Sequence, residues 1–311
     1  MRRTSRRLWR YTEEKNKMET GINLEHFYNR PAGEPKRDFE MVARMIHDSG
    51  FRNLDHSGNY THSDYIEDTK RQREYLDLLG MRVHQSHAPF NRYRTYPDAE
   101  FPELYHRSFE CASILGAKYV VVHADEYRSI ERYDENEIVE YTYDYLAPEV
   151  EFAKKHGMKV AVENLFEDLP SGYKYFDGKS RFTSRVEDII AVIERFNDPD
   201  VVCCWDFGHG AVSYGYDREA SALEKVAKYV GCTHVHDNNA GHDLHMLPFT
   251  GRIDWKRDMD VLAKAGYDGV LSIELVYDRF PDELLPDWFD MNRAAADRLV
   301  TMCSLRKREL K

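Results

Sequence analysis

Four polar residues follow directly on short apolar runs and are of the types that bind divalent metal ions. They are two glutamates, an aspartate and a histidine: Glu163, Asp206, His234 and Glu274. Apolar runs of this length are typical of strands that are buried on both faces. A polar side chain at the end of such a strand is placed for function. Oxygen and nitrogen donors from four strand ends are what a divalent metal ion needs.

The donor types indicate both the ion and the chemistry. Buried carboxylates are costly unless they are paired or bound to a cation. Oxygen donors with imidazole and no thiolate suit Mn, Mg, Co or Zn in a site with open positions. Such an ion could hold two adjacent oxygens of a hydroxy-carbonyl compound while a carboxylate removes the neighbouring C–H proton. Glu163 and Glu274 could face the two sides of that carbon, one as the base and the other as the acid.

Further histidines and acids lie at or just after other apolar runs. A single histidine beside an apolar run is more often a structural residue than a ligand, so the hypothesis rests on the joint pattern. These residues make more than one ion possible. The candidates for an additional metal or for substrate are His87, His123, His209, Asp243 and His245.

Strand and helix patterns alternate along the chain and would bring these residues together. Eight strand-like segments are predicted at residues 21–24, 53–56, 82–87, 119–123, 159–163, 201–206, 232–236 and 270–275. Apolar residues at spacings of three and four predict helices at 36–48, 64–79, 102–115, 138–156, 185–196, 219–229, 255–265 and 287–305. Eight strand–helix units with right-handed crossovers predict an α/β fold, a closed (β/α)8 TIM barrel. Its active site would lie at the C-terminal strand ends.

One catalytic domain is expected at residues 18–311, because 311 residues with 42% apolar content suit a single barrel. Residues 1–17 carry five arginines and few aliphatic residues, which predicts a flexible basic arm, or an extension upstream of a start at Met18. The arm could instead touch nucleic acid, an acidic partner or another subunit. The long connections at 126–137 and 166–184 are lid candidates or surface excursions.

Composition excludes several classes of protein. The net charge of −11 argues against a general polyanion binder, because nucleic-acid affinity depends on Lys and Arg. No apolar run approaches the roughly 20 residues that cross a bilayer, and no apolar signal segment follows the first arginines, so a cytoplasmic protein is expected. The five cysteines lack C-x-x-C spacing, which indicates neither disulfides nor a thiolate zinc site. A homo-oligomer is possible.

Six short motifs follow one another in the second half of the chain. They are Val-Glu-Asn-Leu at 162–165, Asp-Phe-Gly-His at 206–209, His-Val-His-Asp-Asn-Asn at 234–239, Asp-Leu-His-Met-Leu-Pro at 243–248, Gly-Arg-Ile-Asp-Trp at 251–255 and Ile-Glu-Leu at 273–275. In this order they resemble the xylose-isomerase-like superfamily of TIM barrels. This superfamily includes sugar isomerases, ketose 3-epimerases, inosose dehydratases and the apurinic endonucleases of family 2.

The resemblance implies site residues and an activity. In the epimerase branch, the residues matching Glu163, Asp206, His234 and Glu274 bind the metal, the two glutamates also move the proton, and His209 contacts substrate. His87 resembles the substrate-pocket segment, and Asp55 is a less specific candidate for the same role. The chain departs from the ketose 3-epimerases at Ala240, where they have an arginine.

The predicted function is therefore a divalent-metal-dependent isomerase or epimerase of a sugar or keto-polyol, acting through an enediolate. The absence of a Gly-rich phosphate cradle favours an unphosphorylated substrate. One alternative is an inosose-type dehydratase, with His209 or another histidine as the acid. The other is a zinc-dependent apurinic endonuclease, whose trinuclear site the candidate residues resemble. The net charge and a stretch at 237–250 without Lys or Arg argue against DNA as the substrate.

Overall fold

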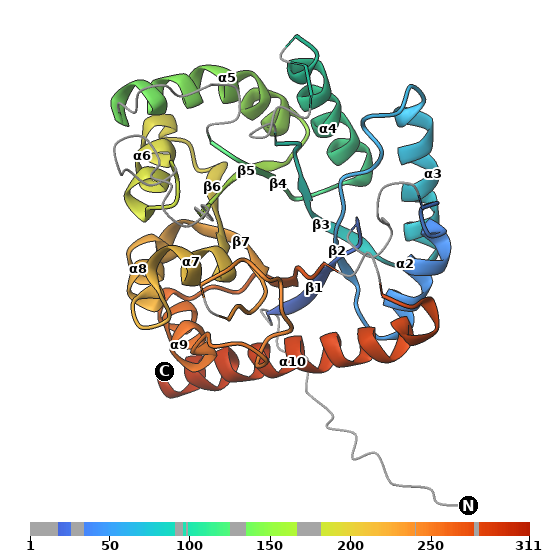
Figure 1. The fold of residues 1–311 in the computed structure, drawn as a ribbon. Helices are drawn as coiled ribbons and strands as arrows, with labels where there is room; N and C mark the ends of the chain where they lie inside the picture. Colours follow the sequence, from blue (N-terminus) through green and yellow to red (C-terminus); the bar gives the residue numbers. More distant parts are fainter. Residues whose placement is uncertain are drawn as a thin grey trace, which may run out of the picture.

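Eight parallel strands close into a barrel, and the helices surround it (Figure 1). We describe it from a computed structural model, which covers residues 18–25, 34–90, 96–97, 99–124, 135–166, 182–239, 241–276 and 280–311. Each strand pairs with the next, and β8 pairs with β1 through Ile22 and Ile273. The strands are β1 (Glu19–Asn23), β2 (Asn53–Asp55), β3 (Arg82–His87), β4 (Tyr119–Val122), β5 (Lys159–Glu163), β6 (Val201–Asp206), β7 (Val230–Val235) and β8 (Val270–Ile273).

The helices pack outside the strands, and α10 runs along one side of the barrel (Figure 1). They are α2 (Phe39–Asp48), α3 (Tyr65–Leu78), α4 (Phe101–Leu115), α5 (Glu135–Lys155), α6 (Val186–Phe196), α7 (Phe207–Tyr214), α8 (Glu219–Val226), α9 (Trp255–Ala265) and α10 (Leu285–Glu309), with 3-10 turns at Ala227–Tyr229 and Asp282–Leu284. Gly116 and Gly266 end α4 and α9 in the left-handed conformation, which glycine adopts without the steric cost of a Cβ atom.

The predicted (β/α)8 barrel is confirmed, with each expected strand present and small shifts at the ends. One helix, α7, is absent from the prediction. Its sequence, Phe-Gly-His-Gly-Ala-Val-Ser-Tyr, is short and has two glycines, so it shows no apolar periodicity. The helix begins because the Asp206 side chain caps it, accepting the backbone N–H of His209 at 2.6 Å.

The inside of the barrel is filled in layers. A buried apolar cluster consists of Tyr119, Val121, Ala161, Cys204 and Cys232. Since side chains alternate between the two faces of a strand, the residue two positions later points the same way, one layer nearer the C-terminal ends. That rule places four polar residues in the next layer, namely His123, Glu163, Asp206 and His234. The strand pattern therefore stacks the candidate donors on an apolar floor.

Several other expectations concern the chain as a whole. The five cysteines are all free and buried, consistent with packing rather than cross-linking. Within the described ranges, no helix has the length and apolar content to cross a membrane. The predicted arm, residues 1–17, and most of the connections at 126–137 and 166–184 lie outside the described residues.

Candidate metal centre

Four residues from neighbouring strand ends form the centre of the candidate site. Glu163 ends β5, Asp206 ends β6, His234 lies in β7, and Glu274 directly follows β8. Each offers one donor atom, and these four atoms lie within 4.8 Å of one another. The residues are buried, from 0% exposed for Asp206 and His234 to 8% for Glu274. We call these four residues the tetrad.

His234 connects the acids of the tetrad to a carboxylate behind it. Its Nδ1 lies 2.8 Å from Glu163 Oε1, 3.5 Å from Glu274 Oε2 and 3.8 Å from Asp206 Oδ2. On the other side, Nε2 donates to Asp55 Oδ2 at 3.1 Å. Burial alone would lower the pKa of His234, but the charges of Glu274 and Glu163 and the bonds to Asp55 and Glu163 raise it well above its ordinary value.

The tetrad fits a divalent cation. Ligand atoms about 2.0 to 2.6 Å from an ion are separated from one another by about 3 to 5 Å, the spacing of these donors. Burial would raise the pKa of both Glu163 and Asp206, but their histidine neighbours hold each pKa below its ordinary value. The two acids are therefore ionised. The proton between His234 Nδ1 and Glu163 occupies the position that a bound ion would take, so the binding of an ion would displace it.

A second group shares Glu163 with the tetrad. The Nε2 atoms of His87 and His123 each lie 3.0 Å from Glu163 Oε2. His87 Nδ1 lies 2.7 Å from the carbonyl of Ala88, which fixes the orientation of the ring. Burial lowers the pKa of His87, but the hydrogen bond to Glu163 and its charge raise the pKa to about 9. His87, His123 and Glu163 could hold an ion of their own.

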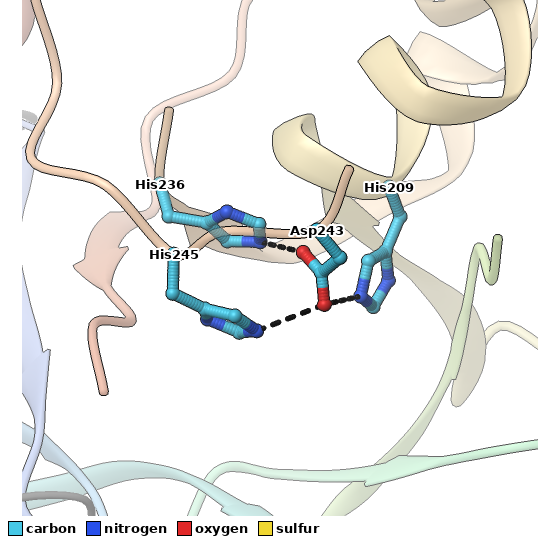
Figure 2. Close-up of side chains that lie close together, drawn as sticks. All are labelled: His209, His236, Asp243 and His245. Carbon is cyan, nitrogen blue, oxygen red and sulfur yellow. Dashed lines mark hydrogen bonds and ion pairs between the residues drawn. The ribbon is translucent and has the colours of Figure 1, made fainter. Parts of the chain in front are cut away.

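A third group surrounds Asp243, whose carboxylate lies between three imidazole rings in Figure 2. Its oxygens lie 3.1 Å from His245 Nε2, 3.7 Å from His209 Nε2 and 3.7 Å from His236 Nε2. His209 Nδ1 donates to the carbonyl of Asn164 at 2.9 Å, so its Nε2 faces Asp243. We call His209, His236, Asp243 and His245 the Asp243 group.

The charges of the Asp243 group reinforce one another. Burial lowers the pKa of both His209 and His245, but nearby carboxylates raise these pKa values to about 10 and about 9. Burial likewise opposes ionisation of Asp243, yet the bonds to His209 and His245 hold the pKa of that carboxyl far below its ordinary value. Three imidazoles around one ionised carboxylate are also a donor set for a cation.

Asp237 builds the loop that carries Asp243 and His245 to the site. Its carboxylate accepts four hydrogen bonds at 2.9 to 3.1 Å, from the backbone N–H groups of Asn238, Phe249 and Ile253 and from the indole of Trp255. Asp237 also forms a two-way backbone bridge with Met246. The motifs around residues 237 and 251–255 therefore have a structural role in shaping this loop.

The structure gathers all the sequence-predicted site residues in or beside the three groups. Asp55 is 1% exposed and contacts His234 and Gln85, so its predicted contact with substrate stays a prediction. Sequence reasoning missed His236 as a site residue. The signal was the His-Val-His spacing, which puts positions 234 and 236 on the same face of the chain.

Comparison with known proteins places the chain in a family. The model for the xylose isomerase-like TIM barrel matches residues 38–299. The chain belongs to this family. Its barrel is similar to solved structures of an L-ribulose 3-epimerase (TM-score 0.71, 16% identity, 94% of this chain and 97% of that one) and a D-tagatose 3-epimerase-like protein (0.68, 20%, 94% and 100%). A third is the 3-keto-D-glucoside 4-epimerase YcjR from E. coli (0.63, 17%, 89% and 100%).

Two curated relatives also match. Protein y4fM of Sinorhizobium fredii is 28% identical over 182 residues, 57% of this chain and 53% of the relative. Protein MJ1311 of Methanocaldococcus jannaschii is 26% identical over 167 residues, 54% of each chain. The chain thus spans about half the length of the curated relatives it matches, and neither name states an activity.

Proposed function

We propose that the protein is a divalent-metal-dependent isomerase or epimerase of a sugar or keto-polyol, which moves a proton next to a carbonyl through an enediolate. The observation that carries this proposal is the tetrad, in which two glutamates from different strands lie with an aspartate and a histidine around one point. The solved structures that share the fold include several sugar epimerases, which supports the same class of substrate.

The tetrad would hold one ion, which could be Mn, Mg, Co or Zn. When bound, the ion supplies charge that polarises the substrate carbonyl and stabilises the oxyanion that forms beside it. Asp206 and His234 serve only as ligands in this proposal. The two glutamates have the second task of moving the proton.

The surroundings of the two glutamates differ, and the difference suggests their order of action. Glu163 is bonded through both oxygens, to His234 on one side and to His87 and His123 on the other. Within the described residues, the histidine nitrogens nearest the Glu274 carboxylate are 3.5 and 4.0 Å away. The Glu274 carboxylate has fewer and longer contacts with histidines than the Glu163 carboxylate. We therefore assign the first proton removal to Glu274 and the return of a proton to Glu163.

Aromatic rings beside the histidines could bind a sugar ring. Phe90 is 46% exposed and stacks on His123 with ring centres 5.0 Å apart. Phe166 lies 4.7 Å from the ring of His209. An apolar face next to hydrogen-bonding imidazoles suits a polyol, which has both C–H and hydroxyl surfaces. We therefore place His87 and His209 at the substrate.

The direct test is solvent isotope exchange. The metal-loaded protein is incubated with a panel of ketoses and inososes in D2O, and mass spectrometry measures the masses of the products and of their fragments. Deuterium gain at the carbon beside the carbonyl, with no loss of water, supports the isomerase or epimerase. Loss of water would instead identify the dehydratase.

A zinc-dependent phosphodiesterase acting on abasic DNA is the second candidate function. The observation that favours it is that three donor groups lie side by side, with Glu163 common to two of them. Neighbouring ions can stabilise both the attacking and the leaving oxygen of a phosphate ester. This candidate predicts several tightly bound zinc ions per chain and incision of an abasic duplex, whereas the isomerase predicts exchange with a sugar and no incision.

A further inference from the structure

His236 occupies the boundary between the tetrad and the Asp243 group. It is fully buried, directly after β7. Its Nε2 lies 3.1 Å from each oxygen of Asp206 and 3.7 Å from Asp243 Oδ1. In Figure 2 this nitrogen points toward Asp243, and the ring of His245 lies below the ring of His236. One ring nitrogen of His236 therefore faces a carboxylate of each group.

The partners of the ring determine which nitrogen carries the proton. Nε2 faces carboxylate oxygens, so it is protonated and donates to Asp206. Nδ1 is buried and has no hydrogen-bond partner within the described part of the chain. The ring stacks on His245 with centres 4.1 Å apart and planes 16° apart. A buried nitrogen without a partner destabilises the fold, so packing alone does not explain a histidine here.

Gly208 provides the space that the His236 ring fills. A Cβ atom at position 208 would lie 1.8 Å from Cε1 and 2.3 Å from Nδ1 of His236. Gly208 lies in the first turn of α7, where alanine would stabilise the helix more than glycine does. His236 and Gly208 are thus each unfavourable locally, but they fit each other.

The bond from His236 fixes the Asp206 carboxylate. Asp206 Oδ1 also accepts the backbone N–H of His209 at 2.6 Å, while Oδ2 faces His234 Nδ1. With a donor at each edge, the carboxylate cannot rotate freely. We propose that His236 is a positioning residue that holds Asp206 in its metal-binding orientation, and that Gly208 is required because it makes room for this ring. The inference rests on the proposed metal-binding function of the tetrad.

The test is a calorimetric titration of metal-stripped protein with Mn²⁺. The binding step that Glu274→Gln removes defines the tetrad, because Glu274 belongs to that group alone. We expect His236→Ala to weaken this step by about 10- to 100-fold, the usual effect of losing a hydrogen bond to a ligand. His236→Gln, whose amide can reach the position of Nε2, should recover part of the loss. His106→Ala removes an imidazole that pairs with Glu149 outside the three groups, and it should change the step less than threefold.

A double-mutant cycle separates positioning from general damage. Gly208→Ala should weaken Mn²⁺ binding as much as His236→Ala does, because the added methyl displaces the ring. In the His236→Ala background, Gly208→Ala should cause no further loss of Mn²⁺ affinity. Without metal, the Tm of the double variant should equal or exceed the Tm of His236→Ala.

Three results would overturn the proposal, and they separate its failure from that of the proposed function. If the wild type binds Mn²⁺ and the His236→Ala variant binds it equally well, or if the losses from Gly208→Ala and His236→Ala are additive, His236 does not position Asp206. If the wild type shows no binding step that Glu274→Gln removes, the metal function of the tetrad fails, and this inference fails with it.

Discussion

Asp55 accepts a hydrogen bond from Nε2 of His234 at 3.1 Å, on the side of the ring that faces away from Glu163. The bond decides which nitrogen is available to an ion, because a protonated Nε2 leaves Nδ1 for the acids of the tetrad. Asp55 is held in turn by Gln85, whose amide donates to the same oxygen at 3.2 Å. A carboxylate behind a histidine ligand fixes its tautomer and raises its basicity.

Replacing Asp55 by asparagine should therefore weaken metal binding. Asp55→Asn keeps the shape but removes the charge, and we expect a 10- to 100-fold higher Kd for Mn²⁺ at the tetrad. Calorimetric titration measures this effect. Asp77→Asn, a matched change on the exposed face of α3, should leave the Kd unchanged. Equal affinities of wild type and Asp55→Asn would show that Asp55 does not support His234.

Metal uptake should release protons. In the ion-free protein the pKa of His234 is well above its ordinary value because the surrounding carboxylates outweigh its burial, so the ring is doubly protonated near pH 7. An ion at the tetrad must displace the Nδ1 proton. Below the raised pKa of His234, the apparent affinity for the metal ion should thus increase about tenfold for each unit by which the pH increases. About one proton should be released per ion bound. A pH-sensitive dye in weak buffer follows the release, and pH-independent binding would contradict the expectation.

A buried pair of acids outside the site should limit stability at neutral pH. Burial raises the pKa of both Glu219 and Asp258, and the protonated Asp258 donates to Glu219, which also accepts the indole of Trp205 at 3.1 Å. Because the folded state binds the proton more tightly than the unfolded chain, the stabilisation that this pair contributes is fully present at low pH. That contribution is lost as the pH rises from the ordinary carboxyl range through the raised pKa of Asp258.

Asp258→Asn should remove this pH dependence. The amide can donate to Glu219 at any pH, so the free energy of unfolding at pH 8 should rise by about 1–3 kcal/mol, with little change at pH 4. Urea unfolding at several pH values measures it. Asp260→Asn on the same helix loses partly exposed ion pairs with Lys264 and Arg306, and should lower stability slightly instead. If the free energies of unfolding of the wild type and Asp258→Asn changed with pH in the same way, Asp258 and Glu219 would not share a proton.

Asp237 should matter for folding more than for chemistry. Asp237→Asn turns an acceptor oxygen into a donor that faces N–H groups, so we expect a loss of about 2–4 kcal/mol in the free energy of unfolding. Asp254→Asn changes the carboxylate that caps α9, where asparagine caps a helix about as well, and should cost much less. Similar losses in the two variants, measured by urea unfolding, would mean that Asp237 does not anchor the loop.

The sequence could predict which residues face the inside of the barrel, but not which of them touch. The period of two along each strand and the apolar runs before Glu163, Asp206 and Glu274 are local features of the chain. The support of His234 by Asp55 joins residues 179 positions apart, and the fit of His236 to Gly208 depends on space between two elements. Such contacts follow from the closure and tilt of the barrel, which no single segment contains.

Helix α7 was missed for a related reason. It is begun by the cap at Asp206 and continues for eight residues without an apolar stripe, so its signal lies in one side-chain contact. That contact joins the helix to the tetrad, because the carboxylate that caps α7 also faces His234.

The most direct measurement is the rate of solvent-deuterium incorporation beside the carbonyl of a sugar substrate, compared among metal-loaded wild type, Glu163→Gln and Glu274→Gln. We expect measurable exchange in the wild type and a loss of about 10²- to 10⁴-fold in each variant, the usual contribution of a general acid or base. Near wild-type exchange in both variants would contradict the assignment of proton transfer to these two glutamates.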